Sequence, residues 1–280
     1  MMLLVACGDE AEGGSGAGGI ATTLTGPSIS ATGVADSATG STADADDGAL
    51  DASGVTGDEP SFDVGNSTSG APQPQDCESS LTVTLRDFAQ SHPDMEDTIA
   101  VDPGIVLPDL GADGLPVYAG GTAGTTHGQK AFDQWYRDVP GVNQTFPFTL
   151  ELAEEADGTF SFDSAAFFPL DGLGFGNEGN EHNYHFTLEL RTSFTYEGGE
   201  VFTFRGDDDV FMFVNGRLGI DLGGVHGPLE ATIDMDAMAA ELGIAVGQTY
   251  ALDFFFAERH TTQSNFRIET SIGCFVPPVG

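Results

Sequence analysis

Three adjacent aspartates stand directly before a hydrophobic run in the stretch GDDDVFMFVNG, residues 206–216. Alternating apolar residues over 210–214, followed by Asn215-Gly216, are typical of a β-strand that enters a tight hairpin. Neighbouring carboxylates repel one another, by about 1 kcal/mol per close pair even in water. The stretch therefore predicts an antiparallel strand whose first residues need a compensating positive charge.

The same period-two pattern recurs along the chain from Cys77 onward. It predicts strands over residues 81–88, 145–152, 158–163, 182–196, 200–206, 210–216, 250–259 and 265–272. Helical spacing is confined to 130–139 and 234–243, the second with an Asp cap and a Gly stop. Many short strands and two short helices predict a mainly β fold, an antiparallel β-sandwich, with the phenylalanine stripes in its core.

The first 76 residues have a different composition, with no Lys or Arg and runs of Gly, Ser, Thr, Ala and Asp. Such a segment buries too little apolar surface to offset chain entropy, so residues 8–76 are predicted to be a disordered acidic linker. We expect one folded domain over 77–274 and a short tail over 275–280. The net charge of −36, from 44 acidic and 8 basic residues, argues against nucleic-acid binding and against attraction to anionic lipid.

The three cysteines suggest export. Leu4-Val5-Ala6-Cys7 is similar to a bacterial lipobox, which predicts residues 1–7 as a signal remnant and Cys7 as the lipidated residue of an outer-membrane or cell-surface lipoprotein. The alternative is a chance match at a cytosolic N-terminus. Cys77 and Cys274 border the structured part and are expected to form a disulfide outside the cell, the alternative being two free thiols.

Five stretches together carry a family resemblance. They are DFAQSHPDME (87–96), FFPLDGLGFG (167–176), HNYHFTLEL (182–190), FTFRGDDDVFMFVNGRLGIDLGGVHG (202–227) and ALDFFFAERHTTQSNFRIETS (251–271). In this order they resemble the fibro-slime domain, of the β-sandwich superfamily named after the anthrax protective antigen. The resemblance implies a jelly-roll-like sandwich in a secreted or surface protein, with calcium-dependent carbohydrate binding or adhesion as the usual role.

The resemblance also implies a calcium site. In the sugar-binding relatives two consecutive aspartates joined by a cis peptide hold the ion, and counting back from the hairpin turn selects Asp207 and Asp208. A later loop supplies the remaining oxygens, which here implies Glu258 and carbonyls near His260 and Thr262.

Three further residues, Asp209, Asn265 and His226, are expected at the ligand-binding edge. Because Asp209 falls where relatives often have Gly, replacing it by Gly should change the calcium affinity little. An ion pair between the aspartate triplet and Arg259 or Arg205 is the structural alternative to a calcium site.

No enzyme motif stands out, so the chain is expected not to be an enzyme. The leading interpretation is a lipid-anchored, calcium-dependent module that binds glycan or matrix, with membrane contact only through its N-terminal lipid. Two alternatives stay open. One is a structural surface module with stabilising calcium and a protein partner, and the other is a polysaccharide-acting enzyme that uses Asp208 and Glu258.

Overall fold

The computed structural model describes residues 77, 78 and 80–278. The lipobox around Cys7 and the predicted linker over 8–76 lie outside the described residues. None of the described helices is long and apolar enough to cross a membrane.

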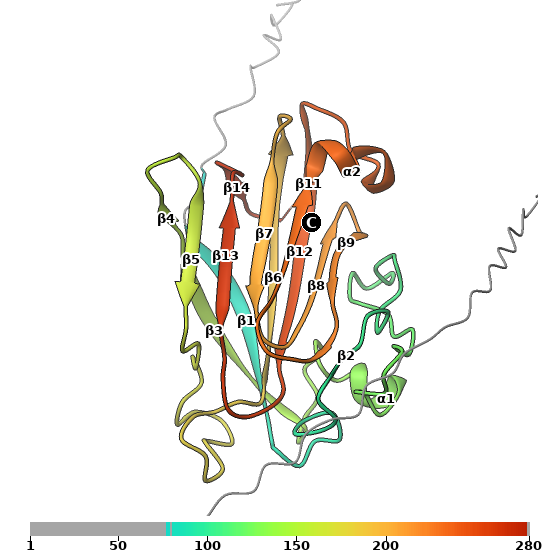
Figure 1. The fold of residues 1–280 in the computed structure, drawn as a ribbon, viewed down its shortest axis with the longest axis vertical. Coiled ribbons are helices and arrows are strands. Elements are labelled where there is room, and N and C mark those ends of the chain that lie inside the picture. Colours follow the sequence, from blue (N-terminus) through green and yellow to red (C-terminus); the bar gives the residue numbers. More distant parts are fainter. Residues whose placement is uncertain (1–76, 79, 279–280) are drawn as a thin grey trace, which may run out of the picture. The chain divides into compact units, whose positions relative to one another are not determined.

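Two antiparallel sheets face each other, as Figure 1 shows. A core of aromatic and aliphatic side chains lies between them. The larger sheet has the order β3 (Asn143–Glu151), β1 (Ser80–Phe88), β6 (Phe186–Tyr196), β12 (Gln248–Glu258), β8 (Asp209–Val214) and β9 (Arg217–Leu222), with β14 (Phe275–Val276) also paired to β6. The smaller sheet has the order β11 (Leu229–Asp234), β7 (Val201–Gly206), β13 (Phe266–Thr270), β5 (Phe160–Ser164) and β4 (Ala153–Glu154). A separate pair joins β10 (Gly224–Val225) to β2 (Ala100–Val101). The predicted antiparallel sandwich is confirmed.

The predicted phenylalanine stripes are all buried, but they belong to two cores. Side chains alternate across a strand, so Phe254 and Phe256 point between the sheets whereas Phe255 points to the outer face of the larger sheet. Phe211 and Phe213 of β8 also lie on that outer face. They pack against Trp135 and its neighbours in the segment 105–136, which therefore covers the larger sheet like a third layer.

The two predicted helices are shorter than expected. The first is one turn, α1 (Gln129–Phe132). The second is α2 (Met235–Leu242), which begins where Asp234 Oδ1 accepts a hydrogen bond from Ala237 N at 3.0 Å and ends at Gly243 with φ of 68°. The Asp cap and Gly stop of the second helix are confirmed.

Strands β9 and β11 were not predicted from the sequence. Their side chains are mostly half-exposed, with one buried residue each, Ile220 and Ile233. Both segments nevertheless alternate in sequence, with apolar Leu218, Ile220 and Leu222 in β9 and Leu229, Ala231 and Ile233 in β11, so the strand signal was present and was missed.

The first and last parts of the domain meet. Cys77 and Cys274 form a disulfide with their Cα atoms 4.8 Å apart, across a sequence separation of 197 residues. The predicted pairing is confirmed. Beside it, Glu78 N donates a hydrogen bond to Phe275 O at 2.9 Å, so backbone pairing supports the same closure.

Candidate functional site

Two connections bring the predicted site residues together, and each carries the chain from one sheet to the other. Residues 207–208 join β7 of the smaller sheet to β8 of the larger one, and residues 259–265 join β12 back to β13. The register pairs Gly206 with Phe266 and Asp209 with Ala257, which fixes both connections at the same end of the sandwich (Figure 1). A Cβ at Gly206 would collide with the backbone oxygen of Asn265, so only glycine permits this approach.

Alternation along β8 and β12 divides the charged residues at this end between two faces. Asp209 and Arg259 lie on the outer face, beside Trp135. Asp208 and Glu258, which directly precede Asp209 and Arg259 in the chain, lie on the inner face. Both pairs are buried, with 0% exposure for Asp209, Arg259 and Glu258 and 3% for Asp208.

The outer pair is fully compensated. Arg259 Nε donates to Asp209 Oδ2 at 2.6 Å and Nη2 donates to Asp209 Oδ1 at 3.1 Å, a two-point contact between guanidinium and carboxylate. Its Nη1 donates to the backbone oxygens of Asp94 and Thr125. The guanidinium carbon also lies 4.7 Å from the centre of the Trp135 ring. This network ties the covering segment to the larger sheet.

The structural alternative of an ion pair is thus correct for Asp209, and the prediction that this residue lies at the ligand-binding edge is wrong. Asp209 has no exposed surface and cannot touch a ligand. Its replacement by Gly would not be neutral, because it would leave Arg259 buried without its carboxylate partner.

The inner pair is not compensated by a basic side chain of its own. Asp208 Oδ1 accepts from His226 N at 2.9 Å and Oδ2 accepts from Arg259 N at 3.0 Å. By geometry neither oxygen of Glu258 accepts a hydrogen bond from any described residue. Burial is the main cause that raises the pKa of Asp208 to about 7 and that of Glu258 well above its usual value, and the mutual repulsion of the two carboxylates adds to the rise for Glu258.

Asp207 completes the acidic group from the bend before β8. Its Oδ2 accepts from both nitrogens of Asn265, at 3.0 Å from the backbone and 2.7 Å from the side chain, while its Oδ1 is buried and accepts no hydrogen bond from a described residue. Asn265 thus orients Asp207. Burial raises the pKa of Asp207 as well.

A cavity of about 180 Å³ opens beside these carboxylates. Its lining includes Asp207, Asp208, His226 and residues 260–263, and the exposed Ile99 lies at its rim. The structure therefore places Asp207, Asp208, His226, His260 and Thr262 around one opening, with Glu258 buried behind them. Asn265 lines a neighbouring cavity that shares Thr262 and Gln263 with the first.

Two features differ from the calcium site that the family resemblance implies. The peptide between Asp207 and Asp208 is trans; the cis peptide of the described chain joins Thr261 to Thr262. Successive aspartates reach different partners because the chain bends here, with Asp207 directed to Asn265 and Asp208 to His226. Also, the described residues contain no group of three or more His, Cys, Asp or Glu side chains that is placed to hold a metal ion.

Sequence reasoning missed Glu96, which anchors the loop over 260–262. Glu96 Oε1 accepts from Thr261 N and contacts His185 Nε2, both at 2.9 Å, and Glu96 N donates to Arg259 O. Burial opposes ionisation of Glu96, but these contacts hold its pKa below the usual value. Nothing local in the sequence marks Glu96, because its partners lie about 90 and 165 residues away.

A family model covers most of these residues. The PA14 domain matches residues 175–274, from the loop before β6 to the second disulfide cysteine. Residues 175–274 belong to a PA14 domain. The predicted protective-antigen-type superfamily is confirmed, and both sheet-to-sheet connections that form the site lie inside the matched PA14 segment.

Relatives of this PA14 chain include two proteins of Dictyostelium discoideum. It is 47% identical to psiD over 184 residues, which cover 60% of this chain and 36% of psiD. It is 39% identical to psiC over 219 residues, which cover 70% of this chain and 42% of psiC. The chain thus spans less than half the length of either relative.

Among solved structures, the chain is similar to a PA14 sugar-binding domain from an RTX adhesin. The match has a TM-score of 0.33 and 12% identity, and covers 69% of this chain and 89% of the other. A second match, to the PA14 domain of the MpAFP antifreeze protein, has a TM-score of 0.32 and 11% identity, and covers 74% of this chain and 92% of the other.

Proposed function

We propose that the PA14 domain binds a calcium ion at its Asp207–Asp208 edge and, through that ion, the hydroxyl groups of a glycan at the cell surface or in a matrix. The observation that carries this proposal is the set of buried carboxylate oxygens without donors, Asp207 Oδ1 and both oxygens of Glu258. Leaving such atoms unsatisfied is costly in a folded protein, and a cation is a partner that satisfies carboxylate oxygens.

The chemistry of the donors suits calcium, which prefers carboxylate and carbonyl oxygens. Asp207, Asp208 and Glu258 would hold the ion, with backbone carbonyls near His260 and Thr262 completing its shell. A bound calcium ion supplies positive charge and open positions for sugar hydroxyls. The protein keeps the carboxylates fixed for this role, since Asn265 orients Asp207 and two backbone N–H groups orient Asp208.

A catalytic role for Asp208 and Glu258 is not supported. A general acid or base must reach within hydrogen-bond distance of its substrate. Glu258 has no exposed surface, and the cavity reaches Asp207 and Asp208 but does not include Glu258 in its lining. The arrangement fits a binding module better than a hydrolase.

Calorimetry of the calcium-free protein tests the ion first. We expect Asp207→Asn to lower calcium affinity at least tenfold, because it removes a charge while keeping the side chain's shape. The matched control is Glu151→Gln, which removes one exposed carboxylate from β3, far along the chain from both connections. Equal calcium binding by both variants, or none by the wild type, would refute the site.

A glycan array with calcium and again with chelator tests the sugar. Signals that need calcium support the glycan role. Calcium binding without any glycan signal would favour instead a surface module that calcium stabilises and that binds a protein partner.

An extracellular or surface location accords with the PA14 assignment. Lipidation at Cys7, in a residue outside the described part of the chain, stays a prediction. Mass spectrometry of the mature N-terminus tests it, and an unmodified Met1 in cell envelopes would contradict it.

A further inference from the structure

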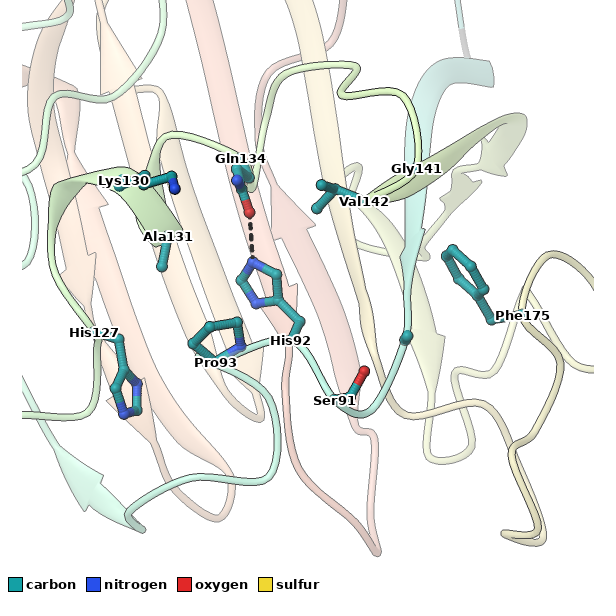
Figure 2. A pocket seen from close by; sticks show the side chains of 11 residues that line it. Ser91, His92, Pro93, His127, Lys130, Ala131, Gln134, Gly141, Val142 and Phe175 are labelled. Carbon is teal, nitrogen blue, oxygen red and sulfur yellow. Dashed lines mark hydrogen bonds between the residues drawn. The ribbon is translucent and has the colours of Figure 1, made fainter.

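The folded domain has a second, larger cavity that the proposed calcium site does not use. It has a volume of about 430 Å³, within the range typical of small-molecule pockets. Three parts of the chain form it, and Figure 2 shows them around the opening: residues 89–93 after β1, residues 127–142 around α1, and Phe175.

The charge of this cavity is unlike that of the rest of the molecule. The chain has 44 acidic residues and its single lysine is Lys130, yet the cavity lining contains Lys130, His92 and His127 and no Asp or Glu. By contrast, the lining of the calcium-site cavity includes Asp207, and that of its neighbour includes Glu181. Lys130 is exposed and forms no ion pair with any described residue.

The polar groups of the cavity act as hydrogen-bond donors. Asp94 N donates to His92 Nδ1 at 3.2 Å, so the proton of the neutral ring is on Nε2, which donates to Gln134 Oε1 at 3.0 Å. Burial lowers the pKa of His92 and so favours this neutral form. The amide nitrogen of Gln134 then makes no hydrogen bond to a described residue, and Figure 2 shows it on the same side as Lys130.

An aromatic ring stands at the other side of the cavity. Phe175 is 37% exposed, although its backbone is held firmly, with Phe175 N donating to the buried Asp87 at 2.5 Å. Gly174 makes this approach possible, since a Cβ there would collide with the Asp87 carboxylate. Figure 2 shows Phe175 across the opening from Lys130, with Val142 and His92 between them.

We propose that this cavity binds a carboxylated sugar, a uronic acid unit of an acidic polysaccharide. Lys130 and the Gln134 amide bind the carboxylate, and the apolar face of the sugar ring packs on Phe175. A neutral sugar would leave Lys130 without a partner, and a small carboxylate would leave Phe175 uncovered. The site needs no calcium, so its test is independent of the function proposed above.

The single lysine permits a specific probe. Reductive dimethylation with ¹³C labels Lys130 and otherwise only a free N-terminal amine, and it keeps the positive charge. In chelator, titration of the full chain with sodium glucuronate should shift the Lys130 methyl signal saturably. Methyl glucoside and sodium acetate should each bind at least tenfold more weakly.

Variants then separate the two contacts, with backbone amide shifts of residues 89–93 as the readout. Lys130→Gln should weaken glucuronate binding at least tenfold, Lys130→Arg should retain most of it, and Phe175→Ala should weaken glucuronate and methyl glucoside alike. Arg267→Gln removes an equal charge from β13 and should change nothing. The proposal is overturned by no saturable shift, by equal binding of glucuronate and either control ligand, or by unchanged binding in Lys130→Gln.

Discussion

The two faces at the end of β8 and β12 differ in how their buried charged side chains are compensated. On the outer face Asp209 has Arg259, and every donor of that guanidinium has an acceptor. On the inner face Asp208 faces another acid, Glu258, and among the described residues no basic side chain forms an ion pair with either carboxylate. The faces are one residue apart in sequence. The comparison supports a structural role for the outer pair and the proposal that the inner pair binds a ligand.

The largest expected effect is on the outer face. Asp209→Ala should destabilise the protein by about 3–5 kcal/mol, because it leaves Arg259 buried and unpaired. Urea denaturation in chelator measures the change in the free energy of unfolding. A loss below about 1 kcal/mol would show that the outer pair does not hold the fold.

The inner face should respond in the opposite direction. In chelator at pH 8, Glu258→Gln should raise the free energy of unfolding by about 1–3 kcal/mol, because folding then no longer buries an ionisable carboxyl group. The same variant should lose the stabilisation that calcium gives the wild type. A variant that is less stable in chelator and keeps its calcium response would contradict the assignment.

The smallest effect is a pH dependence. Burial raises the pKa of Asp208 from 3.8 to about 7 and raises that of Glu258 well above its usual value. A carboxyl group whose pKa is raised in the folded state stabilises the fold fully at pH values below its unfolded-state pKa. This stabilisation is lost as the pH rises through the folded-state pKa. In chelator, the free energy of unfolding should therefore fall between pH 5 and pH 8, by roughly 1 kcal/mol per pH unit.

Saturating calcium should reduce this slope, because the ion replaces the protons of the inner carboxylates. His92, whose lowered pKa acts in the opposite direction, contributes equally with and without calcium and cancels in the comparison. Melting temperatures measured across this range in both conditions give the difference. Identical slopes would show that calcium does not bind these carboxylates.

The sequence predicts much of this fold and less of the site. Alternating or continuous apolar runs in β6, β7, β8 and β12 revealed the sandwich, while β9 and β11, whose shorter alternating segments are mostly half-exposed or exposed, were missed. The covering segment 105–136 has no periodicity at all, and it is held by contacts such as that of Thr125 with Arg259, 134 residues away. Local patterns cannot reveal contacts of that kind.

For the site, strand alternation is the informative signal. Asp208 and Asp209, like Glu258 and Arg259, are consecutive residues at strand ends and must point to opposite faces. Alternation therefore separates Asp209 from Asp208 and Arg259 from Glu258, whereas the pairing of Asp209 with Arg259 also needs the register of β8 and β12. A cis peptide between Asp207 and Asp208, expected from the family resemblance, concealed that division because it would have placed both carboxylates on one side.

The closure at Cys77 and Cys274 has a mechanical consequence. A pull applied to the chain before Cys77 and after Cys274 enters and leaves the domain at neighbouring points, whose Cα atoms are 4.8 Å apart. Once β14 has been pulled from β6, tension passes through one covalent bridge and leaves the remaining hydrogen bonds of both sheets unstretched. A domain connected in this way would keep its ligand-binding edge folded while the chain on either side is drawn tight.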